Sequence, residues 1–167
     1  CEFLGSTNTL INATTIARLS TKEPEFQNNH LDIYESPKEN HYYTLTVDTS
    51  RGIGGDYSAF VVIDITEMPY KVVAKYRDNQ IAPMLYPDVI GKVAKDYNNA
   101  FVLVEVNDIG QQVVEILHEE IEYDNILSTV TDKNRQYVSP GFGKATRLGV
   151  NTSKQVKRQG CFTFKSL

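Results

Sequence analysis

The chain has 167 residues, of which 41% are hydrophobic and 23% are charged, and these values are typical of one soluble globular domain. No apolar run approaches the roughly 20 residues that a membrane-spanning helix needs, and no secretion signal is visible at the N-terminus. Cys1 and Cys161 lie at opposite ends of the chain, where they could form a disulfide or remain free. We expect free thiols and a cytoplasmic protein without a membrane partner.

The net charge of −4 is unevenly distributed along the chain. From Val130 onward there are eight Lys or Arg residues and one acid, whereas the preceding 129 residues hold nine Lys or Arg and 20 acids. An acidic body with a basic C-terminal segment suits a polyanion bound by one part and metal ions bound by the other. A solvated basic helix would produce the same pattern, so both interpretations stay open.

Residues 1–40 differ in character from the rest of the chain. They begin with a stretch that contains Gly, Ser, Thr and Asn, and a short helix is expected from about Thr14. A polar, proline-containing stretch follows at 36–41. We interpret 1–40 as a linker that leads in from an upstream domain absent from this chain. Residues 41–167 are then the main domain.

A strand, a glycine-rich turn and a returning strand are predicted between Tyr42 and Ile65. Residues 42–47 and 58–65 are mostly apolar and β-branched or aromatic, and the turn at 51–56 contains three glycines, which accept the positive φ of a tight reversal. Asp48 follows the first strand, at a rigid position open to solvent. Two interpretations fit it: a ligand for a divalent cation, or a residue that only opens the turn.

Strands and helices alternate in the remainder of the chain. Hydrophobic periods predict a strand over 69–77, a helix over 86–97, a buried strand over 101–105, a helix over 111–120 and a strand over 125–130. A basic helix is expected after Asn151 or Ser153. The predicted fold class is α/β: a mixed β-sheet, with a three-stranded antiparallel meander plus parallel strands, flanked by helices.

Asp48 and Glu105 form the strongest candidate site, because each comes at the C-terminal end of a predicted strand. If those strands are neighbours, the two carboxylates converge, and their repulsion calls for a cation between them. Oxygen ligands favour Mg²⁺ or Mn²⁺, and two such ions about 3.5–4 Å apart can clamp the attacking and leaving oxygens of a phosphodiester. Asp56 and Asp108 would supply further oxygens, although capping of the next helix would also explain Asp108. The histidines lack metal-ligand spacing, so zinc is not expected.

Four stretches of the chain closely resemble the nuclease domain of the large terminase subunit of T4-like tailed bacteriophages: TVDTSRGIGGDYSAFVVIDI, PYKVVAKYRDNQIAPMLYP, VAKDYNNAFVLVEVNDIG and GFGKATRLGV. CEFLGSTNTLI resembles the segment that leads out of that protein's packaging ATPase domain. The resemblance covers nearly the whole chain. It implies an RNase H-like fold and a metal-dependent endonuclease that cuts concatemeric double-stranded viral DNA at the start and end of headful packaging.

The resemblance also implies roles for individual residues. Asp48 in TVDTSRG matches the first catalytic aspartate and Glu105 in LVEVND the catalytic glutamate, while Asp56 and Asp108 match positions that could assist at the metal. The family's third catalytic aspartate would fall beyond Leu167. We therefore expect a nuclease domain that is truncated at its C-terminus and is weak or inactive when tested alone.

A packaging nuclease has to bind DNA with little sequence preference, which suits contacts to phosphates. The candidates are Arg51, Lys144, Arg147, Lys154, Lys157 and Arg158, each of which could instead be a solubilising surface charge. The resemblance further implies the portal protein, the small terminase subunit and an upstream ATPase domain as partners. The expected location is the cytoplasm of the infected bacterial host, at the portal vertex of the procapsid.

Three other functions stay open from the sequence. A Holliday-junction resolvase or transposase-type nuclease would share the fold and the carboxylates, but would cleave branched DNA. An actin-like or sugar-kinase ATPase also uses an Asp-led, glycine-containing hairpin, but a second phosphate loop is not evident. A non-catalytic domain that docks DNA or the portal would need neither carboxylate.

Overall fold

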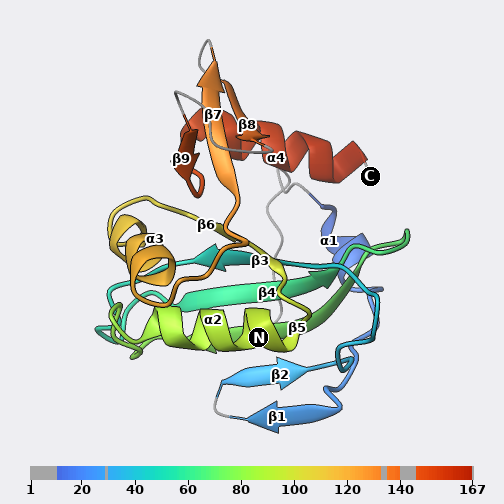
Figure 1. Cartoon of the computed structure of the whole chain (residues 1–167). Helices are drawn as coiled ribbons and strands as arrows, with labels where there is room; N and C mark the ends of the chain where they lie inside the picture. Colours follow the sequence, from blue (N-terminus) through green and yellow to red (C-terminus); the bar gives the residue numbers. More distant parts are fainter. Residues whose placement is uncertain (1–10, 29, 133–134, 140–145, 167) are drawn as a thin grey trace.

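The computed structural model describes residues 11–28, 30–132, 135–139 and 146–166. Its main feature is a six-stranded sheet in the order β1-β2-β5-β4-β3-β6, with helices α2 and α3 on one face (Figure 1). Strands β3 and β6 run parallel, and the other neighbouring pairs are antiparallel. The predicted mixed α/β sheet is confirmed.

The centre of the sheet is the predicted meander. Its strands are β3 (Tyr43–Asp48), β4 (Ser58–Asp64) and β5 (Lys71–Asp78). Helix α2 (Tyr86–Asp96) then crosses one face of the sheet and returns the chain to β6 (Phe101–Val104), which pairs with β3. After α2, Asn98 and Asn99 adopt positive φ angles of 55° and 56°, a conformation that asparagine tolerates at helix ends.

A short hairpin extends the sheet beyond β5. Strand β1 (Phe26–Asn28) pairs with β2 (Leu31–Ile33), and β2 pairs antiparallel with β5. Part of the predicted linker therefore belongs to the main sheet, and helix α1 (Ala13–Ile16) precedes it. Strands of three residues are too short for a hydrophobic period to be recognised in the sequence. The division at residue 40 stays a prediction.

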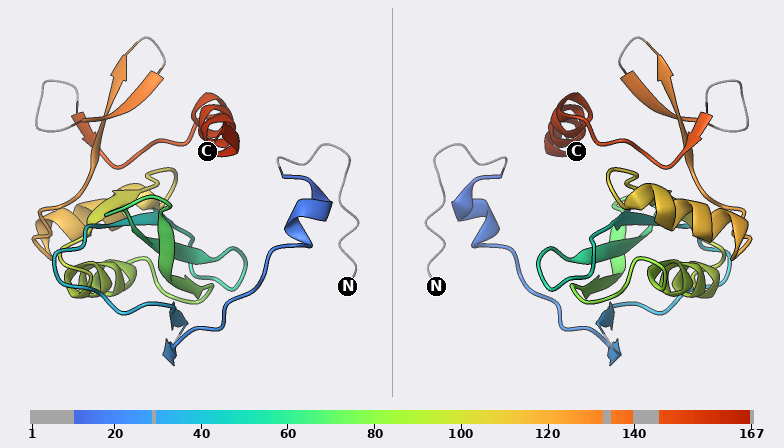
Figure 2. Two further views of the ribbon diagram at one scale, coloured as in Figure 1. Left: turned by 90° about the vertical axis from the view of Figure 1, so that its right-hand side faces the viewer. Right: turned by 90° about the vertical axis from the view of Figure 1, so that its left-hand side faces the viewer.

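The C-terminal part of the chain builds a second sheet. Its strands are β7 (Ser128–Asp132), β8 (Arg135–Ser139) and β9 (Thr146–Leu148). Helix α3 (Gly110–Glu119) precedes these strands in the chain, and helix α4 (Lys154–Ser166) follows them. The strand order is β8-β7-β9, and Figure 2 shows this sheet and α4 set apart from the main sheet. The strand predicted over 125–130 therefore contributes mainly here, while Ile126 makes an isolated parallel bridge to Val102.

The core lies between the six-stranded sheet and helices α2 and α3. Leu45 of β3 is fully buried, and the rings of Phe60, Tyr76 and Tyr86 stack at centroid distances of 5.1 to 6.3 Å. On the opposite face of β3, Thr46 is exposed. Because successive strand residues alternate between faces, the sheet has one face packed on helices and one face that is open.

Within the described residues, every helix is too short or too polar to cross a lipid bilayer.

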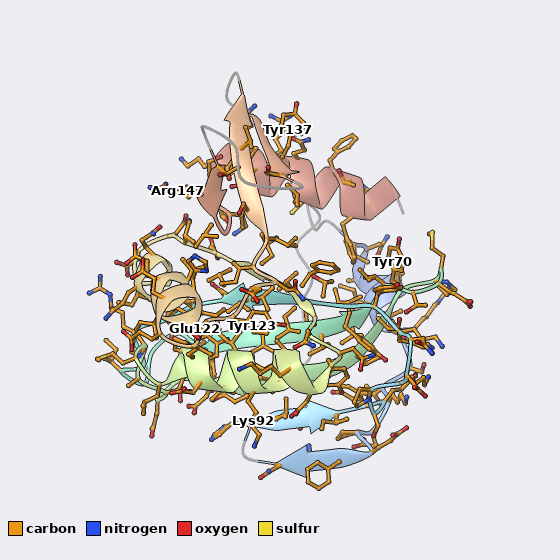
Figure 3. The ribbon with its side chains drawn as sticks, in the orientation of Figure 1. Tyr70, Lys92, Glu122, Tyr123, Tyr137 and Arg147 are labelled. Carbon is orange, nitrogen blue, oxygen red and sulfur yellow. The ribbon has the colours of Figure 1, made fainter. Side chains whose placement is uncertain are left out.

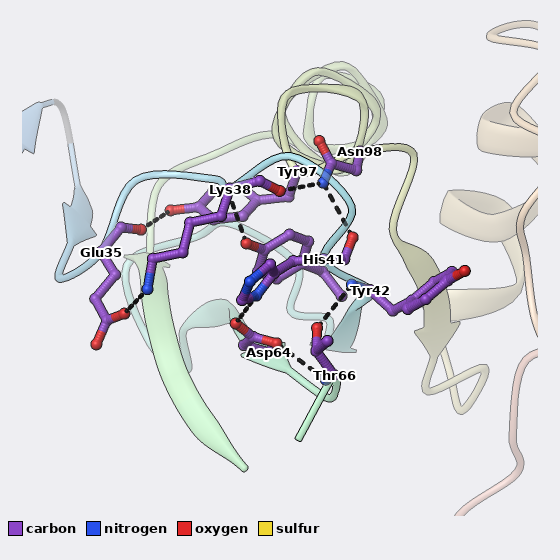
Figure 4. Close-up of polar contacts among 9 residues, drawn as sticks. Glu35, Lys38, His41, Tyr42, Asp64, Thr66, Tyr97 and Asn98 are labelled. Carbon is purple, nitrogen blue, oxygen red and sulfur yellow. Dashed lines mark hydrogen bonds and ion pairs between the residues drawn. The ribbon is translucent and has the colours of Figure 1, made fainter. Parts of the chain in front are cut away.

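A polar cluster holds the chain where it enters β3 (Figure 4). Nδ1 of His41 donates to Oδ2 of Asp64 over 2.7 Å, and the N–H of Thr66 donates to Oδ1 of the same carboxylate over 3.0 Å. The side chain of Asn98, just after α2, donates to the carbonyl oxygens of Lys38 and His41. These bonds attach the segment before β3 to both α2 and β4.

The Asp64 carboxylate should stabilise the fold in a pH-dependent way. Burial would raise the pKa of Asp64, but hydrogen bonds from the side chain and the N–H of Thr66, and from His41, lower it to about 2. Since the pKa in the folded state lies below the ordinary value of 3.8, the ionised carboxylate stabilises the protein above that value, and this stabilisation is lost as the pH falls toward 2.

We expect Asp64→Asn to lower the free energy of unfolding by on the order of 1–2 kcal/mol at pH 7, and by progressively less below pH 4. Urea denaturation across this pH range measures the difference. Asp124→Asn, at an exposed position after α3, is the control. A loss that is the same at every pH would contradict the carboxylate's role.

Candidate active site

Asp48 and Glu105 lie side by side at the C-terminal ends of adjacent parallel strands. Val47 and Val104 are partners in the β3–β6 register, and the N–H of Glu105 donates to the carbonyl oxygen of Val47 over 2.9 Å. Both valines are buried on the helix-covered face, so the next residue of each strand points to the open face. The structure thus brings the two carboxylates together, and their catalytic role stays a prediction.

The two carboxyl groups interact directly. Partial burial raises the pKa of Asp48, a hydrogen bond with the Glu105 side chain raises it further, and the charges of Glu105 and Asp56 act in the same direction. The N–H of Thr49, which donates to Oδ1 of Asp48 over 2.9 Å, opposes these effects. Two carboxylates in such contact are stable only when a proton or a cation neutralises part of their charge.

This pair of ligands suits a hard divalent cation. Both donors are carboxylate oxygens, and both follow strands of a rigid sheet on its open face. In the part of the chain that the structure describes, no group of three or more His, Cys, Asp or Glu side chains is arranged to hold a metal ion. Within the described residues, Asp48 and Glu105 therefore form a pair of carboxylates and not a larger cluster of potential ligands.

The other two acidic candidates lie in loops, and the structure does not gather them with this pair into a group of three or more potential ligands. Asp56 is exposed in the glycine-rich turn and acts on Asp48 through its charge. Asp108 is held by Arg51, whose Nε and Nη2 donate to its two carboxylate oxygens over 3.0 and 2.9 Å. Helix capping by Asp108 is a wrong prediction, because α3 begins after Ile109 without a side-chain cap and Asp108 has a positive φ of 49°. The ion pair instead joins the β3–β4 turn to the β6–α3 loop.

Residues 45–167 match a family model described as the terminase RNaseH-like domain. The chain belongs to this family. The match includes both candidate catalytic carboxylates and extends through α4. The predicted resemblance to large terminase nucleases is confirmed at this level, whereas the narrower likeness to T4-like phages stays a prediction.

Solved structures of a large terminase nuclease from the thermophilic phage G20c share the fold. The form with bound magnesium has a TM-score of 0.68 and 18% identity over 98% of this chain and 71% of that one. The cobalt form has a TM-score of 0.62 and 20% identity, and covers 87% and 63%; the zinc form has 0.62 and 19%, and covers 87% and 69%. This chain thus spans about two thirds of the G20c chain, and the RNase H-like fold is confirmed.

The candidate DNA contacts of this terminase domain fall on separate parts of the structure. Arg51 follows Asp48 by three residues in the β3–β4 turn and is engaged in its ion pair with Asp108. Arg147 is exposed on β9, and Figure 3 shows it with Tyr137 on the three-stranded sheet. Lys144 lies outside the described residues. The remaining three are exposed on α4: Lys154, Lys157 and Arg158.

Two further residues of the terminase domain shape the site, and the sequence prediction missed both. Nδ2 of Asn107 donates to Oε1 of Glu105 over 3.1 Å. A Cβ added at Gly110 would lie 1.9 Å from the carbonyl oxygen of Glu105, so only glycine lets α3 start this close to the end of β6. The sequence did offer a signal for Gly110: glycine is a poor helix former, so a glycine at the start of a predicted helix indicates a close approach of another part of the backbone. Asn107 carried no comparable signal.

Neutralising Asp48 should stabilise the terminase domain at neutral pH. The pKa of Asp48 is raised in the folded state, so folding favours its protonated form, and the ionised form destabilises the protein above that pKa. Without added divalent metal, we expect Asp48→Asn to raise the melting temperature by about 1–3 °C at pH 7, with the gain disappearing below the ordinary value of 3.8.

Calorimetry at several pH values checks this expectation, with Asp124→Asn as the matched loss of one exposed charge. A lower melting temperature for Asp48→Asn at pH 7 would contradict a raised pKa of Asp48 in the folded protein.

Proposed function

We propose that this terminase domain is a divalent-metal-dependent endonuclease that cuts concatemeric double-stranded viral DNA during headful packaging, with Asp48 and Glu105 as its catalytic residues. The observation that carries the proposal is the parallel β3–β6 pairing, which sets these two carboxylates side by side on the open face. Their direct interaction, which raises the pKa of Asp48, supports it as well. Membership in the terminase RNaseH-like family supports the same class of activity.

The proposed cofactor is Mg²⁺ or Mn²⁺, with two ions. The G20c nuclease, which shares the fold, has been solved with bound magnesium, cobalt and zinc, all of which are divalent. In this chain Asp48 and Glu105 would hold the ions, and carboxylate-only donors favour magnesium or manganese over zinc. Asp56 and Asp108 would add oxygens, Asp108 after release from Arg51. Once bound, such ions supply an activated water and neutralise charge on the phosphodiester.

The chain's own basic residues would bind the DNA backbone. Arg147 and the three cations of α4 are exposed, and their charge can neutralise phosphates whatever the base sequence. Arg51 stands closest to the carboxylates along the chain, but its guanidinium is paired with Asp108 and would need to exchange that partner for a phosphate. We assign Lys144 the same role from its sequence context.

The proposed partners follow from the packaging role. They are double-stranded DNA, an upstream ATPase domain of the same protein, the portal protein and the small terminase subunit. The proposed place of action is the cytoplasm of the infected bacterium, at the portal vertex of the procapsid.

Metal binding tests the proposal most directly. We expect Asp48→Asn and Glu105→Gln each to weaken Mn²⁺ binding more than about tenfold, because each removes one of two converging ligands. Electron paramagnetic resonance of free Mn²⁺ measures this affinity without any need for turnover. Whatever nicking of supercoiled plasmid the wild type shows with Mn²⁺, weak as we expect it to be, should fall to background in both variants.

The control for both measurements is Asp124→Asn. Wild-type Mn²⁺ affinity in both variants would refute the proposed centre. Cleavage of branched DNA in preference to linear duplex would instead indicate a resolvase-type enzyme, and DNA packaging that survives both substitutions would indicate a docking domain.

The cations of α4 can be tested through the salt dependence of DNA binding. We expect Lys157→Gln combined with Arg158→Gln to make the slope of log affinity against log salt shallower by about 2, because two phosphate contacts are lost. Fluorescence anisotropy with a labelled duplex measures the slope.

A matched control removes two lysines from α2, namely Lys92 and Lys95, which precede β6 on a different helix. An unchanged slope in the α4 double variant, or an equal change in the control, would assign the α4 cations to general surface charge.

A further inference from the structure

The side chain of Asn107 lies between Glu105 and the segment that leads into α4. Its Nδ2 donates to Oε1 of Glu105 over 3.1 Å and to the carbonyl oxygen of Thr152 over 3.0 Å. Its Oδ1 accepts a hydrogen bond from the N–H of Thr152, also over 3.0 Å. The amide group of Asn107 therefore uses both of its N–H bonds and its oxygen in the protein.

We propose that Asn107 is a positioning residue that holds the Glu105 carboxylate for metal binding and ties it to the start of α4. The inference rests on the proposed function, since it assumes that Glu105 is a metal ligand. It does not make Asn107 a catalytic residue, because Asn107 acts through Glu105.

The orientation of the Asn107 amide is dictated by its neighbour. Thr152 presents one N–H and one carbonyl oxygen, and these require the oxygen and the nitrogen of the amide respectively. A flipped amide would place oxygen against both the Thr152 carbonyl and the Glu105 carboxylate. The second N–H of Nδ2 is thus directed at Glu105 by the backbone of a residue 45 positions further along the chain.

This hydrogen bond matters because a glutamate side chain is otherwise flexible. Glu105 has three rotatable bonds and is only half-buried, so holding its carboxylate in one orientation costs conformational entropy. A donor fixed to Oε1 restricts that motion on the side of the carboxylate that faces Asn107. Groups that orient metal ligands in this way typically change metal affinity or activity by about 10–100-fold when they are removed.

The same segment connects the site to the basic helix. The N–H of Val150 donates to the carbonyl oxygen of Val104 over 2.8 Å, and the N–H of Val106 donates to that of Val150 over 2.9 Å. Thr152, two residues after Val150, is held by Asn107. The side-chain oxygen of Ser153 then accepts a hydrogen bond from the N–H of Val156 at the start of α4. The contact of Asn107 with Thr152 therefore lies one residue before the cap of α4.

The chain contains a matched control for the experiment. Gln136 makes the same reciprocal amide contact with Asn151, the residue before Thr152: its Nε2 donates to the Asn151 carbonyl over 2.9 Å, and its Oε1 accepts from the Asn151 N–H over 3.2 Å. Its amide nitrogen and oxygen are accounted for by Asn151, so it anchors the same segment without a contact to Glu105. Asn107→Leu and Gln136→Leu then differ in the one interaction under test.

We expect Asn107→Leu to weaken Mn²⁺ binding about tenfold, as measured by electron paramagnetic resonance, while Gln136→Leu binds Mn²⁺ as the wild type does. Hydrogen exchange at 151–153 should be faster in both variants, which shows that each has loosened the segment. Melting temperatures confirm that both are folded at the temperature of the assay. If Asn107→Leu does not fold, Asn107→Ala is compared with Gln136→Ala in the same way.

The outcomes separate this inference from the proposed function. Wild-type Mn²⁺ affinity in the Asn107 variant, or an equal loss in the Gln136 variant, would overturn the positioning role while leaving the metal centre intact. A Glu105→Gln variant that binds Mn²⁺ as tightly as the wild type would overturn both.

Discussion

The parallel pairing of β3 with β6 is the constraint on which the rest of the site depends. Its register sets Val47 beside Val104, and so puts the next residue of each strand at the same level and on the same face. A slip of one residue would turn Glu105 toward the helices. Val102 and Val104 are fully buried, so burial of apolar side chains, rather than any attraction between the carboxylates, holds the register.

The fold has to maintain a contact that is unfavourable in itself. Burial raises the pKa of Asp48, and the hydrogen bond with Glu105 and the repulsion between the two carboxylates raise it further. The N–H of Thr49 opposes this effect by donating to the Asp48 carboxylate, and the hydroxyl of Tyr86 donates to the main-chain carbonyl oxygen of Asp48 over 3.4 Å. A stable core can sustain such a cost, and functional sites are where local rules of stability are most often broken.

Much of the fold could be predicted because the central elements carry strong periods. Runs of apolar, β-branched and aromatic residues identify β3 and β4, and helical spacing identifies α2 and α3. The edge strands at 26–33 are too short to show a period, and periodicity cannot tell which sheet a strand such as β7 will join. Spacing alone also allowed Asp108 to cap a helix, whereas its actual partner, Arg51, is 57 residues away in the sequence. Long-range pairs of this kind have no local signature.

The basic residues of β9 and α4 are placed relative to the two carboxylates by backbone contacts with the end of β6. Arg51 is paired with Asp108, whereas Arg147 on β9 and the three candidate cations of α4 are exposed. Backbone hydrogen bonds link that region to β6 through Val150. Gly149 makes this approach possible, because it has a φ of +73° and a Cβ there would lie 2.4 Å from the Val104 carbonyl oxygen. The basic helix is therefore anchored to the strand that presents Glu105, and a polyanion bound on α4 would be held in register with the carboxylate edge rather than on an independent arm.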